Sequence, residues 1–465
     1  MPNLHPDRLF PSDPDTRTLA RRIYESIAKL PIISPHGHTQ AEWFAEDRPF
    51  PDPAQLFIVP DHYIFRMLYS QRAIKMEELG VGENNPINPR GLWRVFAKNY
   101  YLFRGTPTRL WLDFAFRELF DLEPDLSEQT ADLYYDRISE KLAGPDFRPR
   151  ALYDKFGIEV LATTDSALSP LLAHKEIRNS GWNGRILPTF RPDAVVDPDF
   201  ANFPKNVRKL GDSYNEDTQT WEAYLRSLRK ARAHFKAMGC TATDHGHPTA
   251  NSASLSRQRA ASLFEIVLTG QASPTEREQF RAQMLTEMAR MSVEDGLVMQ
   301  IHPGSFRNHN EAIYKKFGRD MGADIPTPTN YVHALKPLLD QVGNESNLTI
   351  ILFTIDESTY SRELAPLAGH YPCLLLGPPW WFQDSPEGMM RFREYATETA
   401  GFYNTVGFND DTRAFLSIPA RHDVARRVDS AFLARLVLEH RLNEEEAFDV
   451  AFQLTNGLVR KAYRL

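Results

Sequence analysis

Eight short apolar segments, each followed by polar or charged residues, constrain the fold of this chain more than any other feature. Stretches with apolar residues at helical spacing separate most of them. Strands that alternate with helices form parallel sheets with right-handed crossovers. Eight such units favour a closed α/β barrel, the (β/α)8 or TIM type, over an open sheet. The expected strands lie in segments 31–38, 158–165, 185–193, 240–247, 296–304, 348–355, 371–381 and 404–411.

Several of the intervening segments carry helix start and stop signals. Segment 220–239 has apolar residues at helical spacing and ends in Gly239, a residue suited to a helix C-cap. Segment 385–401 opens with Ser385 and Pro386, an N-cap and first-turn pair, and closes with Gly401. After the eighth strand, residues 428–455 predict two packed helices at the C-terminal end.

The connection after the first strand is anomalous. Residues 39–157 are far too many for a simple βα loop, and they contain helical patterns such as GLWRVFAKNYYLF. We predict a helical insertion on the catalytic face of one domain that spans residues 1–465. A small N-terminal helical domain followed by a Rossmann-like remainder is a weaker alternative, because no Gly-rich dinucleotide loop follows any strand.

Charge and composition exclude several classes of partner. A net charge of −7 and a pI near 6.1 argue against a nucleic-acid binder. No apolar run reaches membrane-spanning length, and the N-terminal segment lacks the pattern of a signal peptide. Two cysteines, Cys240 and Cys373, argue against a disulfide framework and fit a reducing compartment. We therefore expect a cytoplasmic enzyme with no nucleic-acid or membrane partner, and a homo-oligomer is left open.

Two histidines one residue apart end the first segment, in the order His36, Gly37, His38. Side chains two residues apart in an extended chain point the same way, so both imidazoles are expected to project together from the strand end. Two neutral imidazoles can begin a metal site, and the alternative is a pair of ordinary, partly buried histidines. An aspartate from the eighth segment would add an oxygen ligand. That donor set suits one divalent ion, Zn²⁺ by preference, with an open position for substrate or water.

Most of the expected strand ends, the first included, carry Asp, His, Arg or Trp. In a TIM barrel these ends line one shared pocket, whereas branched apolar side chains fill the interior. Their clustering favours a functional site over coincidence. The residues concerned are His36, His38, Asp165, Arg191, Asp244, His245, His302, Trp380, Trp381, Asp410, Asp411 and Arg413.

Some polar residues near these strand ends have simpler structural interpretations. We expect Asp165, His245 and His247 to be structural, and Asp410 to be hydrogen-bonded scaffold rather than a second ligand. Arg307 is equally compatible with substrate binding and with capping a loop. These interpretations follow from the general scarcity of catalytic residues.

The histidine pair with an aspartate resembles the metal site of the amidohydrolase superfamily. Most two-metal hydrolytic members also use a lysine at the fourth strand, but segment 240–247, CTATDHGH, has none. The sixth segment, 348–355, has no histidine. A two-metal hydrolase is therefore disfavoured.

Within that superfamily, the chain closely resembles one family over most of its length: uronate isomerase, the glucuronate/galacturonate isomerase group. Several of the shared motifs are long and unusual in composition, so as a set they are specific. The family often has a Cys between the two histidines where this chain has Gly37, and that change leaves both imidazoles intact. The motifs are PHGH, PDHYIFRML, LATTDS, LPTFRPD, GCTATDHG, IHPGSFRNHN, GRDMGADIP, WWFQDSPEGMMR and GFNDDTRAFLSIPARHDVARR.

The resemblance implies interconversion of D-glucuronate with D-fructuronate and of D-galacturonate with D-tagaturonate. It makes His36, His38 and Asp411 the ligands of one divalent metal ion. It places His62 and Tyr63, from the insertion, over a uronic acid substrate. The residues that would complete the substrate pocket are Arg191, Asp244, His302, Trp380 and Arg413.

The chemistry of an aldose–ketose isomerisation agrees with those roles. The reaction needs a base, a means of polarising two oxygens, and a cationic anchor for the carboxylate. Asp411 can serve as the base at C2, Tyr63 as a proton donor or shuttle at C1, and His62 can assist ring opening. Arg191 and Arg413 would bind the carboxylate through their guanidinium groups. Trp380 would offer a flat apolar face to the sugar carbons.

Two other functions remain open from the sequence. A one-metal hydrolase or decarboxylase of the same superfamily would use His36, His38 and Asp411 to activate water against a small carboxylate substrate. A non-catalytic sugar-acid binding protein is a poorer interpretation, because the chain keeps the base, the ligands and the clamp together.

Overall fold

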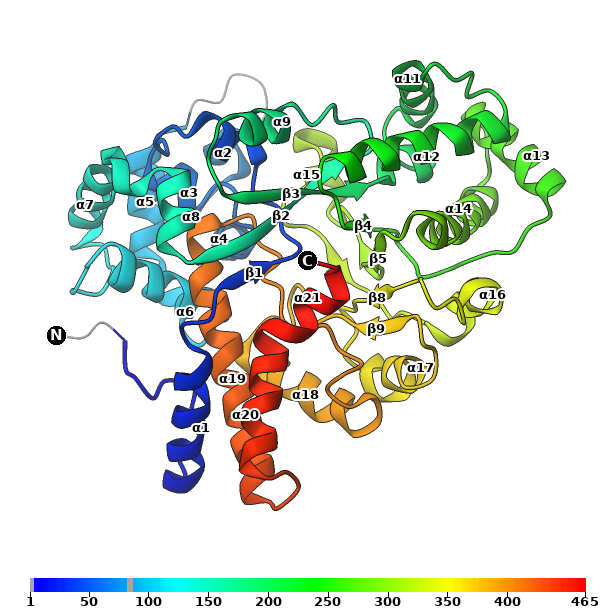
Figure 1. Cartoon of the computed structure of the whole chain (residues 1–465). Coiled ribbons are helices and arrows are strands. Elements are labelled where there is room, and N and C mark those ends of the chain that lie inside the picture. The colour runs from blue at the N-terminus through cyan, green and yellow to red at the C-terminus, as the bar shows by residue number, and fades with distance from the viewer. Residues whose placement is uncertain (1–3, 82–86) are drawn as a thin grey trace.

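A curled, seven-stranded parallel sheet forms the centre of the computed structural model, which describes residues 4–81 and 87–465 (Figure 1). Neighbouring strands follow the order β1-β2-β3-β4-β5-β8-β9. The strands are shorter than the sequence segments that predicted them, except for β2. Their bounds are β1 Ile32–Ser34, β2 Ile158–Ser166, β3 Arg185–Arg191, β4 Ala242–His245, β5 Val298–Ile301, β8 Ile350–Leu352 and β9 Leu374–Leu376.

The eighth predicted strand, 404–411, is not a regular strand, although its chain runs where an eighth strand belongs. It makes one parallel bridge, between Leu376 and Thr405, and beyond it the carbonyl of Thr412 accepts a hydrogen bond from the amide of His38 at 3.0 Å. The segment therefore joins β9 to the end of β1 and closes the ring. Gly407 and Asp411 have positive φ angles of 78° and 37°, which interrupt the extended conformation. The (β/α)8 fold is confirmed, with an irregular eighth member.

One apolar side chain from each strand points into the barrel, and together they form its interior cluster. The residues are Ile33, Val160, Leu187, Ala242, Val298, Ile351, Leu375 and Val406. Because side chains alternate along a strand, every second residue beyond these points toward the open end of the barrel. The position of the inward-pointing residue on each strand therefore determines which side chains at the strand end face the site.

Helices pack around the outside of the sheet, as the sequence patterns predict (Figure 1). The expected caps are present: Ser385 accepts a hydrogen bond from the amide of Gly388, and Gly401 ends the helix that follows. These helices are α9 Leu172–Asn179, α10 Asp193–Val196, α11 Phe203–Tyr214, α12 Trp221–Ala237, α13 Arg257–Leu268, α14 Pro274–Asp295, α16 Val332–Val342, α17 Ala365–Ala368 and α18 Pro386–Ala400.

The described part of the insertion, 39–81 and 87–157, contains helices and no strand. Its apolar side chains pack against Ile32, Ile158 and Leu161 of β1 and β2, so its core is continuous with the outer face of the barrel. That continuity agrees with a single domain, which stays a prediction. The helices are α2 Ala41–Glu46, α3 Pro53–Phe57, α4 His62–Ser70, α5 Pro89–Lys98, α6 Pro107–Phe114, α7 Ala131–Ala143 and α8 Pro149–Lys155.

Two further regions complete the molecule. After β5, an excursion not foreseen in the sequence forms a small antiparallel pair, β6 Ser305–Phe306 and β7 Ile325–Pro326, with α15 Glu311–Phe317 between them. At the C-terminal end, the predicted helices are α19 Ile418–Leu438 and α20 Glu444–Phe452, followed by α21 Leu458–Tyr463; α1 Pro14–Ile27 packs on them. Among the described residues, we find no helix with the length and apolar character needed to cross a membrane.

Candidate active site

A cavity of about 600 Å³ opens at the C-terminal ends of the strands, between the barrel and the insertion. The cavity is lined by side chains from β3 and β4, from the segments after β1, β4, β5 and β9, from α4 and α19, and from the closing segment 411–414. Every residue that the sequence assigned to catalysis, substrate or metal lies on its wall: His36, His38, His62, Tyr63, Arg191, Asp244, His302, Trp380, Asp411 and Arg413.

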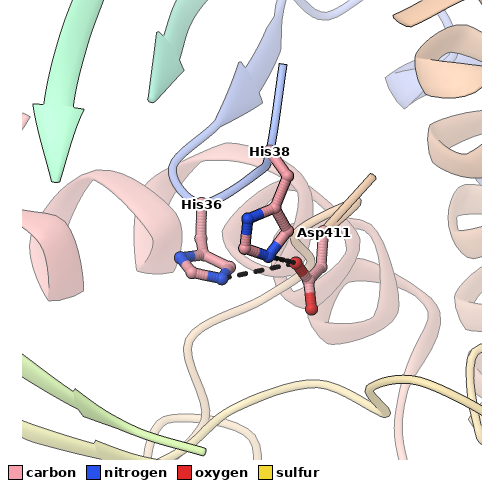
Figure 2. Close-up of side chains that lie close together, drawn as sticks. All are labelled: His36, His38 and Asp411. Atoms are coloured by element: carbon pink, nitrogen blue, oxygen red, sulfur yellow. Dashed lines mark ion pairs between the residues drawn. The ribbon is translucent and has the colours of Figure 1, made fainter. Parts of the chain in front are cut away.

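Three of these residues form a cluster with metal-ligand geometry (Figure 2). Nε2 of His36 lies 3.3 Å from Oδ1 of Asp411, and Nε2 of His38 lies 3.1 Å from the same oxygen. That oxygen is buried and accepts no hydrogen bond from the described residues. Ligand atoms that each lie about 2.0–2.2 Å from one tetrahedral ion stand roughly 3.3–3.6 Å apart, close to the observed spacing. Two imidazole nitrogens and a carboxylate oxygen therefore fit a divalent cation.

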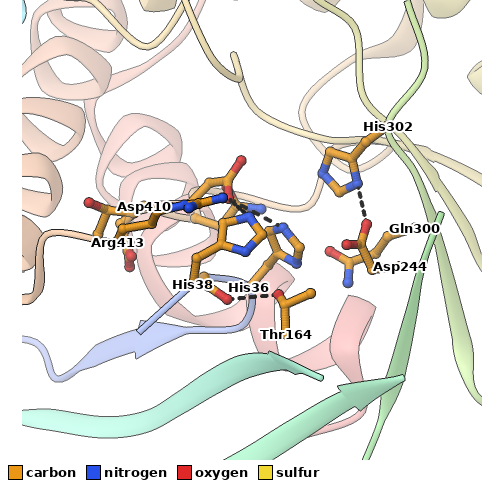
Figure 3. Close-up of polar contacts among 12 residues, drawn as sticks. His36, His38, Thr164, Asp244, Gln300, His302, Asp410 and Arg413 are labelled. Carbon is orange, nitrogen blue, oxygen red and sulfur yellow. Dashed lines mark hydrogen bonds and ion pairs between the residues drawn. The ribbon is translucent and has the colours of Figure 1, made fainter. Parts of the chain in front are cut away.

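The backbone holds this cluster in place from two sides. β1 ends at Ser34, so the two histidines follow the strand rather than belong to it. The hydroxyl of Thr164, on β2, donates to the carbonyl of Gly37 at 2.8 Å (Figure 3), and the amide of His38 donates to the closing segment. Burial opposes the ionisation of Asp411, but the His36 imidazole beside it holds the pKa of that carboxyl well below its usual range.

A second polar cluster lies across the cavity floor, on β3, β4 and the end of β5. Asp244 Oδ1 lies 2.7 Å from Nδ1 of His302 (Figure 3), and its Oδ2 lies 3.2 Å from Nη1 of Arg191. Nε of Arg191 also donates to Asp193 at 2.8 Å. Burial is countered by Arg191, which holds the pKa of Asp244 well below its usual range. Arg191 is thus already matched by two carboxylates.

His302 connects the two clusters. Its ring stacks on the rings of Phe353 and His36, with centroid distances of 4.0 Å and 4.8 Å. The indole of Trp380 meets it edge-on, with a centroid distance of 4.7 Å. Its Nε2 is buried without a hydrogen-bond partner among the described residues. Ligand atoms of His36, Asp244 and His302 lie close enough together to form a second metal-ligand group.

The insertion contributes His62 and Tyr63 from the first turn of α4, where Asp61 caps the helix by accepting from the amide of Tyr63 at 2.8 Å. The Tyr63 hydroxyl donates to Asp384 at 2.7 Å and accepts from the amide of Phe382 at 2.8 Å. Burial raises the pKa of Tyr63 well above its usual value. Burial, with a smaller effect from Arg413, lowers the pKa of His62 to about 4, so this imidazole is neutral at pH 7.

Arg413 is the most loosely held arginine of the predicted set. Its Nη2 lies 3.6 Å from Asp320, and its side chain is 43% exposed. Arg307, which had two interpretations, both lines the cavity and binds Asp324 at 2.9 Å. Arg413 therefore reaches the cavity with less compensation than Arg191.

The residues expected to be structural do not line the cavity. His245 and His247 are buried and do not line the cavity, and Asp165 accepts from Thr163 at 2.6 Å. Asp410 lies 3.0 Å from Nε2 of His422.

Comparison with known proteins identifies the family of this chain. The model of the glucuronate isomerase family matches residues 15–456. The chain belongs to the glucuronate isomerase family. It is similar to the uronate isomerase of Rhizobium meliloti (strain 1021), with 62% identity over 466 residues that cover 99% of each chain.

Solved structures agree. The chain is similar to glucuronate isomerase from Caulobacter crescentus, with a TM-score of 0.97 and 56% identity over 99% of this chain and 97% of that one. It is also similar to uronate isomerase from Thermotoga maritima, with a TM-score of 0.92 and 28% identity over 100% of both chains. The family resemblance drawn from the sequence motifs is confirmed.

For this member of the glucuronate isomerase family, the buried cavity-wall residues that sequence reasoning missed include Asp384 and Arg421. Both stand inside motifs that carried the resemblance, WWFQDSPEGMMR and SIPARHDVARR. Neither ends a strand, so the search for loaded strand ends passed over them. Their place inside these two motifs was the available signal.

Proposed function

We propose that this protein is a uronate isomerase that interconverts D-glucuronate with D-fructuronate and D-galacturonate with D-tagaturonate. The observation that carries the proposal is the convergence of His36, His38 and Asp411 in a cavity that Tyr63 and His62 also line. Membership of the glucuronate isomerase family supports the same reaction. The cavity also presents guanidinium groups, which suit an acidic sugar; they belong to Arg191, Arg307, Arg319, Arg413 and Arg421.

We infer that His36, His38 and Asp411 hold one divalent ion, with Zn²⁺ as the first choice because two imidazoles and one carboxylate are typical of its catalytic sites. When bound, such an ion supplies Lewis-acid polarisation of the substrate oxygens. The fit rests on the common oxygen, Asp411 Oδ1, that both imidazoles approach.

Proton transfer in this proposal belongs to side chains of the chain itself. The C2–H bond breaks and Asp411, ionised at neutral pH, accepts the proton. That proton passes to C1 by way of the Tyr63 hydroxyl, and the hydroxyl proton on O2 moves to O1, so both side chains end in the protonation states in which they began. Tyr63 keeps its proton at neutral pH because its pKa is raised, which suits a donor or shuttle rather than a base. His62 is neutral and can orient the hydroxyl that ring opening releases.

The substrate's carboxylate needs a cationic anchor, and we propose that Arg413 and Arg191 share that role. Arg413 is the more available of the two, because its one ion-pair partner among the described residues, Asp320, lies at 3.6 Å. Arg191, between Asp193 and Asp244, would contribute through a free edge of its guanidinium. Trp380 supplies an apolar surface beside His302 against the sugar carbons.

A direct assay tests the function. Purified protein supplied with Zn²⁺ is incubated with each uronate in D₂O, and the products are followed by NMR. We expect ketouronate from at least one substrate, with deuterium at C1 because the migrating proton can exchange while it rests on the base. Absence of ketouronate from both substrates, with the metal bound, would favour the one-metal hydrolase instead.

A further inference from the structure

We propose that Asp384 and Arg421 are positioning residues that join the insertion's Tyr63 to the backbone beside Asp411. The hydrogen-bonded series Tyr63, Asp384, Arg421 and the carbonyl of Asp410 is called here the Arg421 strap. The inference rests on the proposed function, because it assigns Tyr63 and Asp411 to the same reaction. It adds a structural reason why two residues 348 positions apart in the chain keep one geometry.

At one end of the strap, Asp384 fixes the Tyr63 hydroxyl. That hydroxyl donates to Oδ1 of Asp384 at 2.7 Å and accepts from the amide of Phe382 at 2.8 Å, two contacts from the single loop after β9. The ring is held as well, edge-on against Trp111 at 5.6 Å. Because the hydroxyl has only one hydrogen, the orientation of the O–H bond is set by Asp384.

At the other end, Arg421 holds the segment that carries Asp411. Nη1 of Arg421 donates to Oδ2 of Asp384 at 2.8 Å and to the carbonyl of Asp410 at 3.2 Å, and its Nε donates to Ser417 at 3.1 Å. The guanidinium carbon lies 3.5 Å from the centroid of the Trp111 ring. Planar stacking and several fixed donors are properties that lysine does not share.

The backbone at Asp411 needs such support. Its φ of 37° lies in the left-handed region, which is disfavoured for a residue with a side chain. The donor from Arg421 precedes this residue, and the amide of His38 binds the carbonyl that follows it. The conformation that aims the Asp411 carboxylate at the two imidazoles is thus fixed from both sides.

Burial makes the strap rigid. The side chains of Arg421 and Asp384 are 5% and 12% exposed, so removing one charge leaves the other without an opposite charge beside it in a site of low dielectric. A purely structural ion pair would have the same burial, and this chain contains one for comparison. Arg393 and Asp429 join α18 to α19 with exposures of 5% and 11%, and neither lines the cavity.

A double-mutant cycle tests the Tyr63 end. Asp384→Asn keeps the size of the side chain and removes its charge, and we expect kcat to fall roughly 10–100-fold. In a Tyr63→Phe background the same change should alter kcat by no more than about 2-fold, since there is no hydroxyl left to orient. The control Asp429→Asn should lower the melting temperature and leave kcat within about 2-fold of its parent in both backgrounds.

An equal loss in both backgrounds would overturn the proposal, because Asp384 would then act independently of Tyr63. No loss in either background would overturn it as well. Wild-type turnover in the same assay is the separate test of the proposed function, so the two failures are distinguishable.

The Asp411 end is tested without activity. Arg421→Lys keeps the positive charge beside Asp384 but cannot reach Asp384, Ser417 and the Asp410 carbonyl together. We expect the affinity for Zn²⁺, measured by competition with a chromophoric chelator, to fall about 10-fold or more. Arg393→Lys is the matched control and should bind Zn²⁺ as the wild type does. Unchanged affinity in Arg421→Lys, or an equal loss in the control, would contradict the strap; this arm also decides the matter if Asp384→Asn fails to fold.

Discussion

The sequence contains the tripeptide His-Gly-His twice, at 36–38 and at 245–247, and the two copies have opposite fates. The first copy follows β1 and the second begins at the last residue of β4, and both are largely buried. The first copy points both imidazoles into the cavity toward Asp411. The second points both away from it, and the cavity is lined instead by its neighbours Asp244 and Gly246.

A shift of one residue in the strand phase explains the difference. On β4 the interior residue Ala242 is followed inward by Asp244 and Gly246, so His245 and His247 face outward toward the helices. On β1 the interior residue is Ile33, and unbroken alternation would also turn His36 outward. β1 stops at Ser34, before Pro35, and the phase changes there. The same motif therefore becomes a ligand pair in one place and packing in the other.

The largest expected difference between the copies is in metal content. His36→Ala should lose the bound ion and reduce isomerisation to the detection limit, because one of three ligands is gone. His247→Ala is the matched change in the second copy; it should lower the melting temperature but keep the metal. Elemental analysis of both purified variants checks this, and loss of metal from the His247 variant alone would reverse the assignment.

Tyr63 tests whether the metal cluster works with the insertion. Tyr63→Phe keeps the ring and removes the hydroxyl, so kcat should fall roughly 10²–10⁴-fold if that hydroxyl moves a proton in the transition state. Metal content should stay at the wild-type level. Steady-state kinetics with the better uronate measure this, and an unchanged kcat would remove Tyr63 from the reaction.

The two central glycines should differ in their tolerance of a methyl group. A Cβ on Gly246 would lie 2.3 Å from Nη2 of Arg191 and displace it, whereas a Cβ on Gly37 would meet no atom closer than 3.6 Å. Gly246→Ala should therefore lower kcat/KM by up to about 100-fold through misplacement of Arg191. Gly37→Ala should be close to wild type. Equal effects of the two substitutions would show that Arg191 is not needed in its present position.

The smallest expected effect is a pH dependence of stability at the second copy. Burial, with a smaller effect from His247, lowers the pKa of His245 to about 3, below the ordinary value of 6.5. Below pH 6.5 the unfolded chain binds a proton that the folded chain refuses, so stability falls as pH drops from 6.5 toward 3. The contribution is about 1.4 kcal/mol for each pH unit.

His245→Asn should remove that contribution. Denaturant titrations between pH 7 and pH 4.5 should give a flatter dependence of the unfolding free energy on pH for the variant than for the wild type. Other titrating groups contribute to both proteins and cancel in the difference. Parallel curves would show that His245 is not held neutral by its surroundings.

The sequence predicted the barrel and the strand-end residues of the candidate site because both depend on local signals. Arg191, Asp244 and His302 lie at or next to the ends of β3, β4 and β5, and the alternation of side chains places them in the cavity. The irregular pairing of the eighth segment could not be foreseen, since it depends on the positive φ of Asp411 and on Gly407. A Cβ atom at Gly407 would lie only 2.3 Å from the carbonyl oxygen of Leu454.

The partners that join distant segments were also out of reach. Asp384 and Arg421 act through hydrogen bonds to Tyr63 and to the Asp410 carbonyl, which no periodicity in the sequence reports. The antiparallel pair of β6 and β7 has only two residues in each strand, too few for a pattern. Such features become visible only when the chain is folded.

Anomalous diffraction at the zinc edge, from crystals grown with Zn²⁺, tests most directly whether the phase of the two His-Gly-His copies decides where the metal binds. We expect one strong peak about 2.0–2.2 Å from Nε2 of His36, Nε2 of His38 and an oxygen of Asp411, and none beside His245 or His247. A peak at the second copy, or at His36, Asp244 and His302 with Asp411 left unbound, would contradict it.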